Sequence, residues 1–400
     1  MKPHRDPNLR IIIFVTLMAV LGISSIAPAL PAIARALDIS PQRIGWLITA
    51  FTLPGIFLTP VLGVLADRYG RKRILVPSLM LFGLAGSACG LTSDFQWLCL
   101  FRFFQGIGAA ALGMLNVTLI GDLFTGRERA AAMGYNASIL SLGTAVFPAI
   151  GGGLAQLDWH YPFWLALAAI PAGLLVIFRL HNPEPLQHQS WREYLGGVRR
   201  GILRRQVFGL FAVSTLTFLL LFGSYLTFFP LLMDEKFAAS PAVIGLLLSS
   251  SSLATMVAAA SLGRLTRRFR ATRLMQLGFM LYFLSLALIP FLPGLLWLLL
   301  PSLLFGAGMG LNMPSLMTLL TGLAPLEHRA AFMSLNGMVL RLGQTLGPPV
   351  MAVMYSYGGM PAPFLGGAVV ALVGWLVLAV VVKEPAVEAS SRSGTSNGDR

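Results

Sequence analysis

Long runs of apolar residues, separated by short polar connectors, occupy most of the chain. About 20 consecutive apolar residues are enough for a helix to cross a bilayer. Gly and Pro occur within several runs, and membrane helices tolerate them better than soluble helices do. The pattern therefore predicts an all-α membrane protein with twelve spans. They cover residues 11–34, 43–66, 74–92, 96–121, 131–156, 162–180, 207–232, 242–265, 274–292, 295–320, 331–356 and 362–382.

The composition agrees with this pattern. Of the 400 residues, 56% are hydrophobic and only 11% are charged, whereas soluble domains have about 25% charged residues. The net charge of +14 would also suit a protein that binds nucleic acid, but such proteins carry their charge on one face of a soluble domain. Here the basic residues lie in connectors between apolar runs, so we expect membrane lipid, and not nucleic acid, as a partner.

The basic connectors also predict the topology. On one side of the predicted membrane, the loops contain Arg35, Arg43 and Lys236 as their Lys and Arg residues. Arg102 and Arg341 lie within spans, and the rest of the 29 Lys and Arg residues lie on the opposite side. Cytoplasmic loops are rich in Lys and Arg. We therefore expect both termini on the cytoplasmic side of the inner (plasma) membrane, and we call this side the inner side.

The two halves of the chain repeat each other at a shift of 200 residues. SPQRIGWLITAF from Ser40 aligns with SPAVIGLLLSSS from Ser240, and RAAAMGYNASILSLG from Arg129 aligns with RAAFMSLNGMVLRLG from Arg329. A chance similarity between apolar runs would not place polar residues in register. We infer a duplicated six-helix unit with the substrate site between its two copies.

The longest connector divides the two copies. We expect an N-terminal six-helix bundle over residues 1–180, a cytoplasmic loop over 181–206 and a C-terminal six-helix bundle over 207–384. Residues 385–400 are rich in Ser and Gly, and we expect them to form a disordered cytoplasmic tail.

Three motifs resemble those of a known family. GVLADRYGRKR at residues 63–73 is similar to the cytoplasmic signature of the major facilitator superfamily, and RFFQGIGAA from Arg102 is similar to its fourth-helix motif. GYNASILSLGTAVFPAIGG at residues 134–152 resembles the fifth-helix motif of the twelve-span drug:proton antiporters, a multidrug and metabolite efflux branch. Phe147 stands where these antiporters usually have Gly. The resemblance implies the major facilitator fold, with two pseudo-symmetric six-helix bundles.

The resemblance also implies a conformational latch in the first motif. Asp67 would face the first turn of the eleventh span, where the helix dipole stabilises a carboxylate. With Arg71 and Asp122 it would form a charge network that holds the inner side closed. The alternative is a solvated run of charges, which is our interpretation of Lys72 and Arg73. The residues assigned to the latch are Gly63, Asp67, Arg68, Gly70, Arg71 and Asp122.

Two arginines are predicted within spans, where charges are costly and usually functional. Arg102, together with Gln105, is a candidate for coupling or substrate binding, because the matching Arg of the exporter branch takes part in proton transfer. The alternative for Arg102 is a side chain that snorkels to the outer face. Arg341 is a candidate for binding an anionic group of the substrate or for organising polar neighbours such as Gln344.

The fifth-helix motif predicts close helix packing, because small residues let helices approach each other. The resemblance implies that span five packs against span eight and seals the path between the bundles. The residues of this motif are Gly134, Gly143, Pro148, Gly151 and Gly152.

A central cavity is expected between the bundles, lined mainly by spans one, four, seven and ten. Hydrogen bonds between helices explain Asn136 and Asn336 equally well. The polar candidates for the cavity are Ser25, Asn116, Asn136, Tyr225, Asn312 and Asn336.

The acidic residues constrain the proposed chemistry. Every Asp and Glu is predicted at the end of a span or outside the membrane. A proton-driven antiporter usually keeps a titratable carboxylate in its cavity. Coupling would therefore use an acid at a helix end, such as Asp38, Asp122 or Asp234.

The expected function is that of a secondary transporter. It would be a monomer, without cofactor or metal, that exports small amphipathic compounds by alternating access in exchange for protons. The alternative is a transporter of an anionic metabolite, siderophore or lysolipid without proton coupling. The sequence has no nucleotide-binding loop, and its five His residues are predicted in loops or tails, so an enzyme is not expected.

Overall fold

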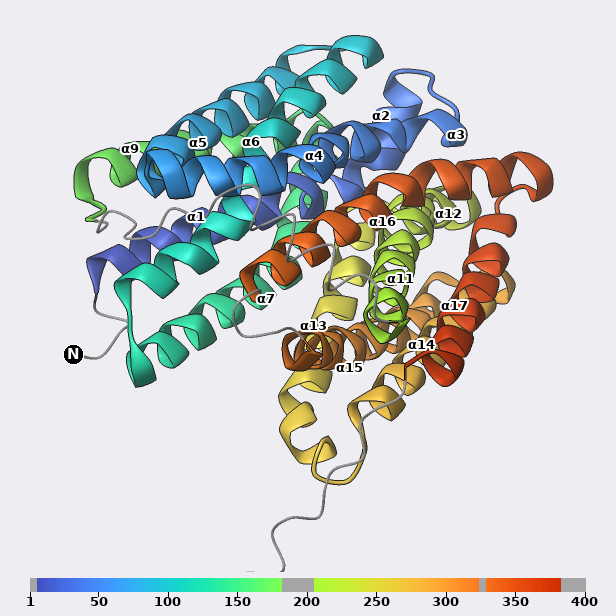
Figure 1. The fold of residues 1–400 in the computed structure, drawn as a ribbon. Coiled ribbons are helices and arrows are strands. Elements are labelled where there is room, and N and C mark those ends of the chain that lie inside the picture. The colour runs from blue at the N-terminus through green and yellow to red at the C-terminus, as the bar shows by residue number, and fades with distance from the viewer. Residues whose placement is uncertain (1–5, 182–204, 324–328, 383–400) are drawn as a thin grey trace, which may run out of the picture.

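The computed structural model describes residues 6–181, 205–323 and 329–382, without the side chains of residues 329–334. In these ranges every regular element is helical and no strand occurs. The helices form two groups, one from α1 to α9 and the other from α11 to α17 (Figure 1). Eleven helical segments of the described chain are long and apolar enough to cross a membrane. The predicted all-α membrane fold is confirmed, while most of the predicted loop 181–206 and the tail 385–400 lie outside the described residues.

Each predicted span corresponds to one helix or to a series of shorter helical segments. The first group contains α1 (Pro7–Ser24), η2 (Ala27–Ala29), α2 (Leu30–Ala36), α3 (Pro41–Ile44), α4 (Trp46–Tyr69), α5 (Arg71–Ala88), η3 (Cys89–Leu91), α6 (Phe95–Leu123), α7 (Gly126–Leu157), α8 (Tyr161–Trp164), η4 (Leu165–Ala168) and α9 (Ala169–Arg179). The second group contains α11 (Arg205–Leu219), the π-helix η5 (Leu220–Phe228), α12 (Phe229–Phe237), α13 (Pro241–Leu265), α14 (Ala271–Leu288), η6 (Ile289–Phe291), η7 (Leu295–Leu298), α15 (Leu299–Leu323), α16 (Arg329–Gly358) and α17 (Ala362–Val380). The eleventh predicted span corresponds to α16, which is not among the eleven segments just mentioned.

Close backbone contacts recur at equivalent places in the two bundles. A Cβ atom on Gly106 of α6 would lie 2.0 Å from the carbonyl oxygen of Phe51 in α4. A Cβ atom on Gly306 of α15 would lie 1.9 Å from the carbonyl oxygen of Ser251 in α13. The two pairs are related by the shift of 200 residues. The duplication of the sequence is therefore also a duplication of helix packing that depends on Gly.

The two bundles meet along two pairs of helices, α7 with α13 and α4 with α16. A Cβ atom on Gly245 of α13 would lie 2.2 Å from the carbonyl oxygen of Pro148 in α7. In the second pair, a Cβ atom on Gly45, just before α4, would lie 2.9 Å from the Cβ of Pro348 in α16. Gly45 and Pro348 are the repeat partners of Gly245 and Pro148. A contact between equivalent Gly and Pro residues thus joins the bundles on both sides of the pseudo-twofold axis, although the proline atoms that make it differ.

Polar contacts between the bundles occur at the outer ends of the helices and near their middle. Arg35 of α2 and Asp234 of α12 form an ion pair near the outer ends. Near the middle, the Ser252 hydroxyl of α13 donates to the carbonyl oxygen of Thr144 in α7 at 3.0 Å. One continuous hydrophobic cluster joins the outer part of the first bundle to the second bundle, from Ile26 to Val382. The outer halves of the two bundles are therefore packed together.

The inner halves of the same helices are further apart. Among the described residues, Cβ atoms added to Gly134 of α7 or to Gly263 of α13 would meet no atom outside their own helical turns within 4 Å. In Figure 1 the two groups of helices are closest near α2, α3 and α12 and diverge toward the N-terminal end of α1. The arrangement is therefore that of two bundles closed on the outer side and separated on the inner side.

The contact between α7 and α13 can be tested with two adjacent glycines. A Cβ atom on Gly152 would lie 2.2 Å from the carbonyl oxygen of Pro241, whereas a Cβ atom on Gly153 would have nothing within 4 Å. We expect Gly152→Ala to lower the stability by about 1–3 kcal/mol through overpacking. Gly153→Ala should leave it unchanged or slightly raised, since Ala favours helix. Thermal unfolding of the detergent-purified variants measures both, and equal Tm values would contradict the close contact.

Candidate functional site

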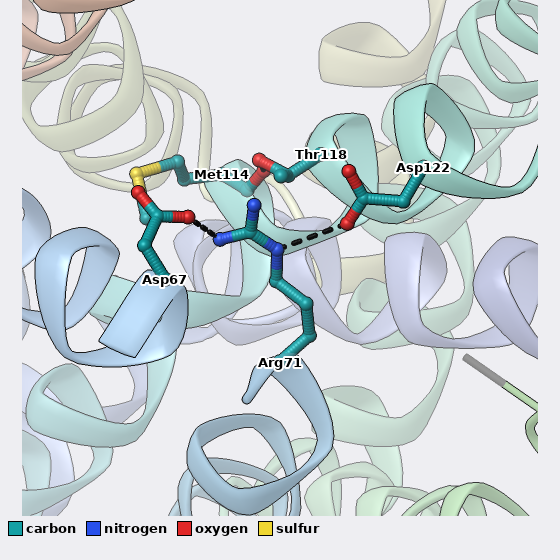
Figure 2. Close-up of polar contacts among 5 residues, drawn as sticks. All are labelled: Asp67, Arg71, Met114, Thr118 and Asp122. Carbon is teal, nitrogen blue, oxygen red and sulfur yellow. Dashed lines mark hydrogen bonds and ion pairs between the residues drawn. The ribbon is translucent and has the colours of Figure 1, made fainter. Parts of the chain in front are cut away.

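Two acids and one arginine form a charge network at the inner end of the first bundle. Arg71, the first residue of α5, forms an ion pair with Asp67 near the end of α4. Its Nε also donates to Oδ2 of Asp122, near the end of α6, at 3.0 Å. Figure 2 shows the guanidinium between the two carboxylates. The structure therefore brings together the three charged residues that the sequence analysis assigned to one network.

The glycines of the first motif shape the backbone around this network. Gly70 has a φ of 99° between α4 and α5, a conformation that favours Gly. A Cβ atom on Gly63 would lie 2.8 Å from the Cε of Met114, so the end of the Met114 side chain of α6 packs over this glycine of α4. Arg68 lies over the ring of Tyr69, with its Cζ 5.6 Å from the ring centroid. The facing turn of the eleventh span lies outside the residues whose side chains are described, so the contact expected for Asp67 stays a prediction.

Lys72 differs from its sequence interpretation as a solvated base. Its Nζ donates to the carbonyl oxygens of Ile177 and Leu180 at the end of α9. The last carbonyl groups of a helix have no partner within the helix. Lys72 therefore caps α9, and Arg73 is exposed as expected.

Arg102 is fully buried in the first bundle, with 0% exposure. Its Nε donates to the carbonyl oxygen of Leu47 at 3.2 Å, and its Nη1 donates to the carbonyl oxygen of Gly22 at 2.7 Å and to Oε1 of Gln105 at 2.8 Å. The guanidinium carbon lies 4.3 Å from the centroid of the Phe51 ring. The alternative that Arg102 snorkels to the outer face is wrong, because these partners hold it among spans one, two and four.

A break in the first span supplies one of these partners. In a regular helix the amide of Ile26 would donate to the carbonyl of Gly22, but it donates instead to the carbonyl of Ile23 at 3.1 Å. The carbonyl of Gly22 is thereby available to Arg102. Neither the break nor the bond to Gly22 was predicted, although the run APALPA that follows Ile26 contains two prolines and is a sequence signal for such a break.

Arg341 lies in a different environment, at the contact between α16 and α4. A Cβ atom on Gly55 of α4 would lie 2.9 Å from Cδ, 3.0 Å from Nε and 3.2 Å from Cζ of Arg341. The Arg341 side chain is partly exposed. Gln344, one turn away on α16, is 8% exposed. Arg102 and Arg341 are thus in separate sites, one inside a bundle and one between the bundles.

The polar cavity candidates are buried, and most of them bond to neighbouring helices. The Thr16 hydroxyl of α1 donates to Oδ1 of Asn136 at 2.5 Å and accepts from Nδ2 of Asn116 at 3.0 Å. In the second bundle, Nδ2 of Asn312 donates to the hydroxyl of Thr217 at 2.8 Å. The sequence analysis missed both threonines, which have no signal beyond their polarity within apolar runs.

The other three cavity candidates are also enclosed. The Ser25 hydroxyl donates to the carbonyl oxygen of Leu21 at 2.7 Å. Tyr225 stacks on Phe305 with ring centroids 4.3 Å apart, and Asn336 is 3% exposed. In this conformation none of the six candidates is exposed. Their role in lining a cavity stays a prediction.

The fifth-helix motif is divided between two partners. Gly151 packs on the first span, since its added Cβ would lie 1.9 Å from the carbonyl oxygen of Ser25. Gly152 and Pro148 pack on α13. The ring of Phe147 lies over Gly143, 3.3 Å from where a Cβ would be, and is partly buried against the core of the first bundle. Gly134 has no neighbour within 4 Å of an added Cβ, so the inner end of the motif makes no such close contact.

Comparison with known proteins identifies the family. The model described as Major Facilitator Superfamily matches residues 12–234 and, a second time, residues 211–397. The chain is 27% identical over 389 residues to "Multidrug resistance protein 2" of Bacillus subtilis (strain 168), with 94% of each chain covered. It is 26% identical over 357 residues to the "Bacillibactin exporter" of the same organism, covering 86% of this chain and 88% of the relative. The solved structure of nucleoside transporter NupG has a similar fold, with a TM-score of 0.77 at 16% identity over 95% of this chain and 100% of that one.

The two matches of the family model cover almost the whole chain, so the protein belongs to the Major Facilitator Superfamily. It is therefore a multi-pass membrane transporter with the major facilitator fold, and not an enzyme. Its relatives include proteins named for multidrug resistance and for export.

The partners of Arg102 lead to a stability prediction. Arg102→Lys keeps a buried charge but replaces the planar group that reaches Gly22, Leu47 and Gln105 with a single ammonium group. We expect a loss of about 1–3 kcal/mol for each buried group left unpaired, and hence a clearly lower Tm in detergent. Arg73→Lys, at an exposed position, is the matched control. An unchanged Tm for Arg102→Lys would show that the three hydrogen bonds do not hold these spans together.

Proposed function

We propose that this member of the Major Facilitator Superfamily exports small amphipathic compounds by alternating access, in exchange for protons. The observation that carries the proposal is the distribution of contacts between the bundles. The Gly–Pro contacts and the Arg35–Asp234 ion pair lie in the outer half. In the inner half, Gly134 and Gly263 face no neighbouring helix among the described residues. A substrate would enter from the inner side, and rocking of the two bundles would then release it outside.

The charge network would act as a latch on the inner side. Asp67 and Asp122 together carry two negative charges and Arg71 carries one positive charge, so the network is net negative. The first turn of α16 carries the positive end of a helix dipole. When the inner ends approach each other, attraction between the network and α16 would stabilise the closed inner side. The side-chain exposures of 35% for Asp67 and 26% for Asp122 support their availability for this contact.

The Arg35–Asp234 pair would act on the outer side in the opposite phase. Arg35 is 58% exposed and Asp234 19% exposed, and an exposed pair contributes at most about 1 kcal/mol. Its rupture would cost little when the outer side opens. Asp234, Asp122 and Asp38 are the acids proposed for proton coupling, because within the described membrane spans Asp and Glu occur at helix ends.

An alternative function is transport of an anionic metabolite, siderophore or lysolipid without proton coupling. The position of Arg341 between the bundles favours it, since no described acid lies at the same depth to form a pair with this cation. For either function we propose the inner (plasma) membrane as the location, both termini in the cytoplasm and a monomeric transporter.

Transport in proteoliposomes distinguishes the two functions. With a pH dye trapped inside, addition of an amphipathic cargo should cause a proton flux that depends on the reconstituted protein. Empty liposomes are the control. If a cargo is carried and the internal pH does not change, the exchange for protons is wrong and the alternative function remains.

The latch predicts a selective loss of transport. Asp67→Asn removes one negative charge from the network while keeping the size of the side chain, so we expect transport to fall at least about tenfold without loss of Tm. Arg73→Gln changes the charge at an exposed position of the same connector and should leave transport unchanged. Equal transport by Asp67→Asn and the unaltered protein would remove Asp67 from the mechanism.

A further inference from the structure

We propose that Arg341 is the binding site for the acidic group of an amphipathic organic anion. This inference deepens the proposed function and rests on it for the role of the site in transport. It concerns the class of compound that the protein binds: an apolar body bearing a carboxylate or a chemically similar anionic group.

The first observation is the lack of a protein partner. Among the described residues, the guanidinium of Arg341 has no hydrogen bond and no ion pair, whereas Arg102 has three hydrogen bonds to protein oxygens. A cation within a membrane span is costly unless it finds a counter-charge, oxygen ligands or water. Arg102 is held by its own bundle through these three bonds, although its Nη2 has no partner among the described residues. Arg341 has no such bond to the described residues and remains available to a ligand.

The second observation is the shape of the facing helix. Gly55 of α4 has no side chain. The atoms Cδ, Nε and Cζ of Arg341 occupy the space that a side chain would fill there. The guanidinium therefore lies against the backbone of the other bundle. It is placed on the contact surface between the bundles, where a ligand would touch both.

The third observation is that the duplication does not account for this charge. Under the shift of 200 residues, Arg341 corresponds to Ser141 and Gly55 corresponds to Thr255. The equivalent contact of α7 with α13 thus has neither the cation nor the glycine. The two residues differ from their repeat partners together, as expected if the glycine accommodates the arginine.

A further polar group lies beside Arg341. Gln344 is three residues away and hence on the same side of α16. It is 8% exposed, and its Oε1 has no partner among the described residues. Buried side-chain oxygens without a partner are uncommon. A protonated or amide-bearing part of a ligand, or a water molecule held with it, would satisfy this oxygen while Arg341 binds the acid.

The site lies where the inner side gives access to it. On α4 and α16 the contacts run from Gly45 and Pro348 inward through Thr49 and Thr345. Gly55 and Arg341 follow next along both helices. A ligand that enters between the separated inner halves would therefore meet Arg341 before the closed outer half. An anion that reaches this depth among apolar spans needs an apolar body, which gives the stated class.

A pair of fluorescent compounds tests the proposal in binding experiments. Dansylglycine bears a carboxylate and dansylcadaverine bears an ammonium group on the same fluorophore. We would titrate each into the full-length protein in phosphatidylcholine nanodiscs and record dansyl fluorescence. Dansylglycine should bind, and Arg341→Gln should weaken its binding at least about tenfold, the factor that a charge-assisted hydrogen bond contributes. Dansylcadaverine should bind no more weakly to this variant than to the unaltered protein.

Two further variants keep the test valid if Arg341→Gln folds poorly. Arg341→Lys retains the charge but not the planar guanidinium, and should give an intermediate affinity for dansylglycine. Gly55→Ala places a Cβ 2.9 Å from Cδ of Arg341, and should weaken dansylglycine binding without removing a charge. Arg73→Gln removes an exposed inner base and should change nothing.

Several results would overturn the proposal. They are no binding of dansylglycine to the unaltered protein, equal binding to Arg341→Gln, or a parallel loss for both compounds. An anionic lipid could also use Arg341. If phosphatidylglycerol in the nanodiscs abolishes dansylglycine binding, and does so through Arg341, the site binds the headgroup of a bilayer lipid, and its assignment to a transported organic anion is wrong.

The outcomes remain separate from those of the proposed function. If dansylglycine binds through Arg341 but no cargo is transported in proteoliposomes, the proposed export is wrong and the proposed anion site stands. If the protein exports dansylcadaverine but does not bind dansylglycine, the proposed anion site is wrong and the proposed export stands.

Discussion

Polar groups within a membrane need partners inside the protein, because the hydrocarbon core supplies none. In this transporter such groups are paired mainly within a bundle. Arg102 joins spans one, two and four, and Thr16 joins Asn116 to Asn136. The closest contacts between the bundles are instead made at glycines, with backbone carbonyl groups at Gly152 and Gly245 and with the Pro348 ring at Gly45. Hydrogen bonds thus stiffen each bundle, while the surface between bundles can separate without leaving many buried polar groups unpaired.

The duplication makes the packing symmetric but leaves the charges asymmetric. Gly45 with Pro348 repeats Gly245 with Pro148, and Gly106 repeats Gly306. By contrast, Asp67 has Arg267 as its repeat partner, and Arg341 has Ser141. Symmetric packing suits two bundles that rock about a common axis. The charges are distributed asymmetrically along the surface between the bundles. The proposed latch at its inner end and the proposed anion site near its middle both rest on this asymmetry.

The sequence by itself determined the membrane class, the segments that form helices, the duplication and the family. Apolar runs of this length and number are stable as helices within a membrane. Glycines at equivalent positions of the two halves indicate close helix packing from the sequence alone. It also grouped Asp67, Arg71 and Asp122, because the first motif resembles one whose geometry is shared by the family. These features follow from local composition or from a pattern that the whole family repeats.

Tertiary structure alone decided which polar residues face each other. The sequence places Arg102 in a family motif and Arg341 outside one, but it does not show that Arg102 is held by the carbonyls of Gly22 and Leu47 while Arg341 lies against Gly55 without a described partner. Both are single arginines in apolar helices. Whether such a group is satisfied depends on the rotation of its helix and on a break in another span, and these are set by contacts between residues far apart in the chain. The same holds for the cavity candidates, whose burial in this structure follows from contacts between helices and not from their polarity.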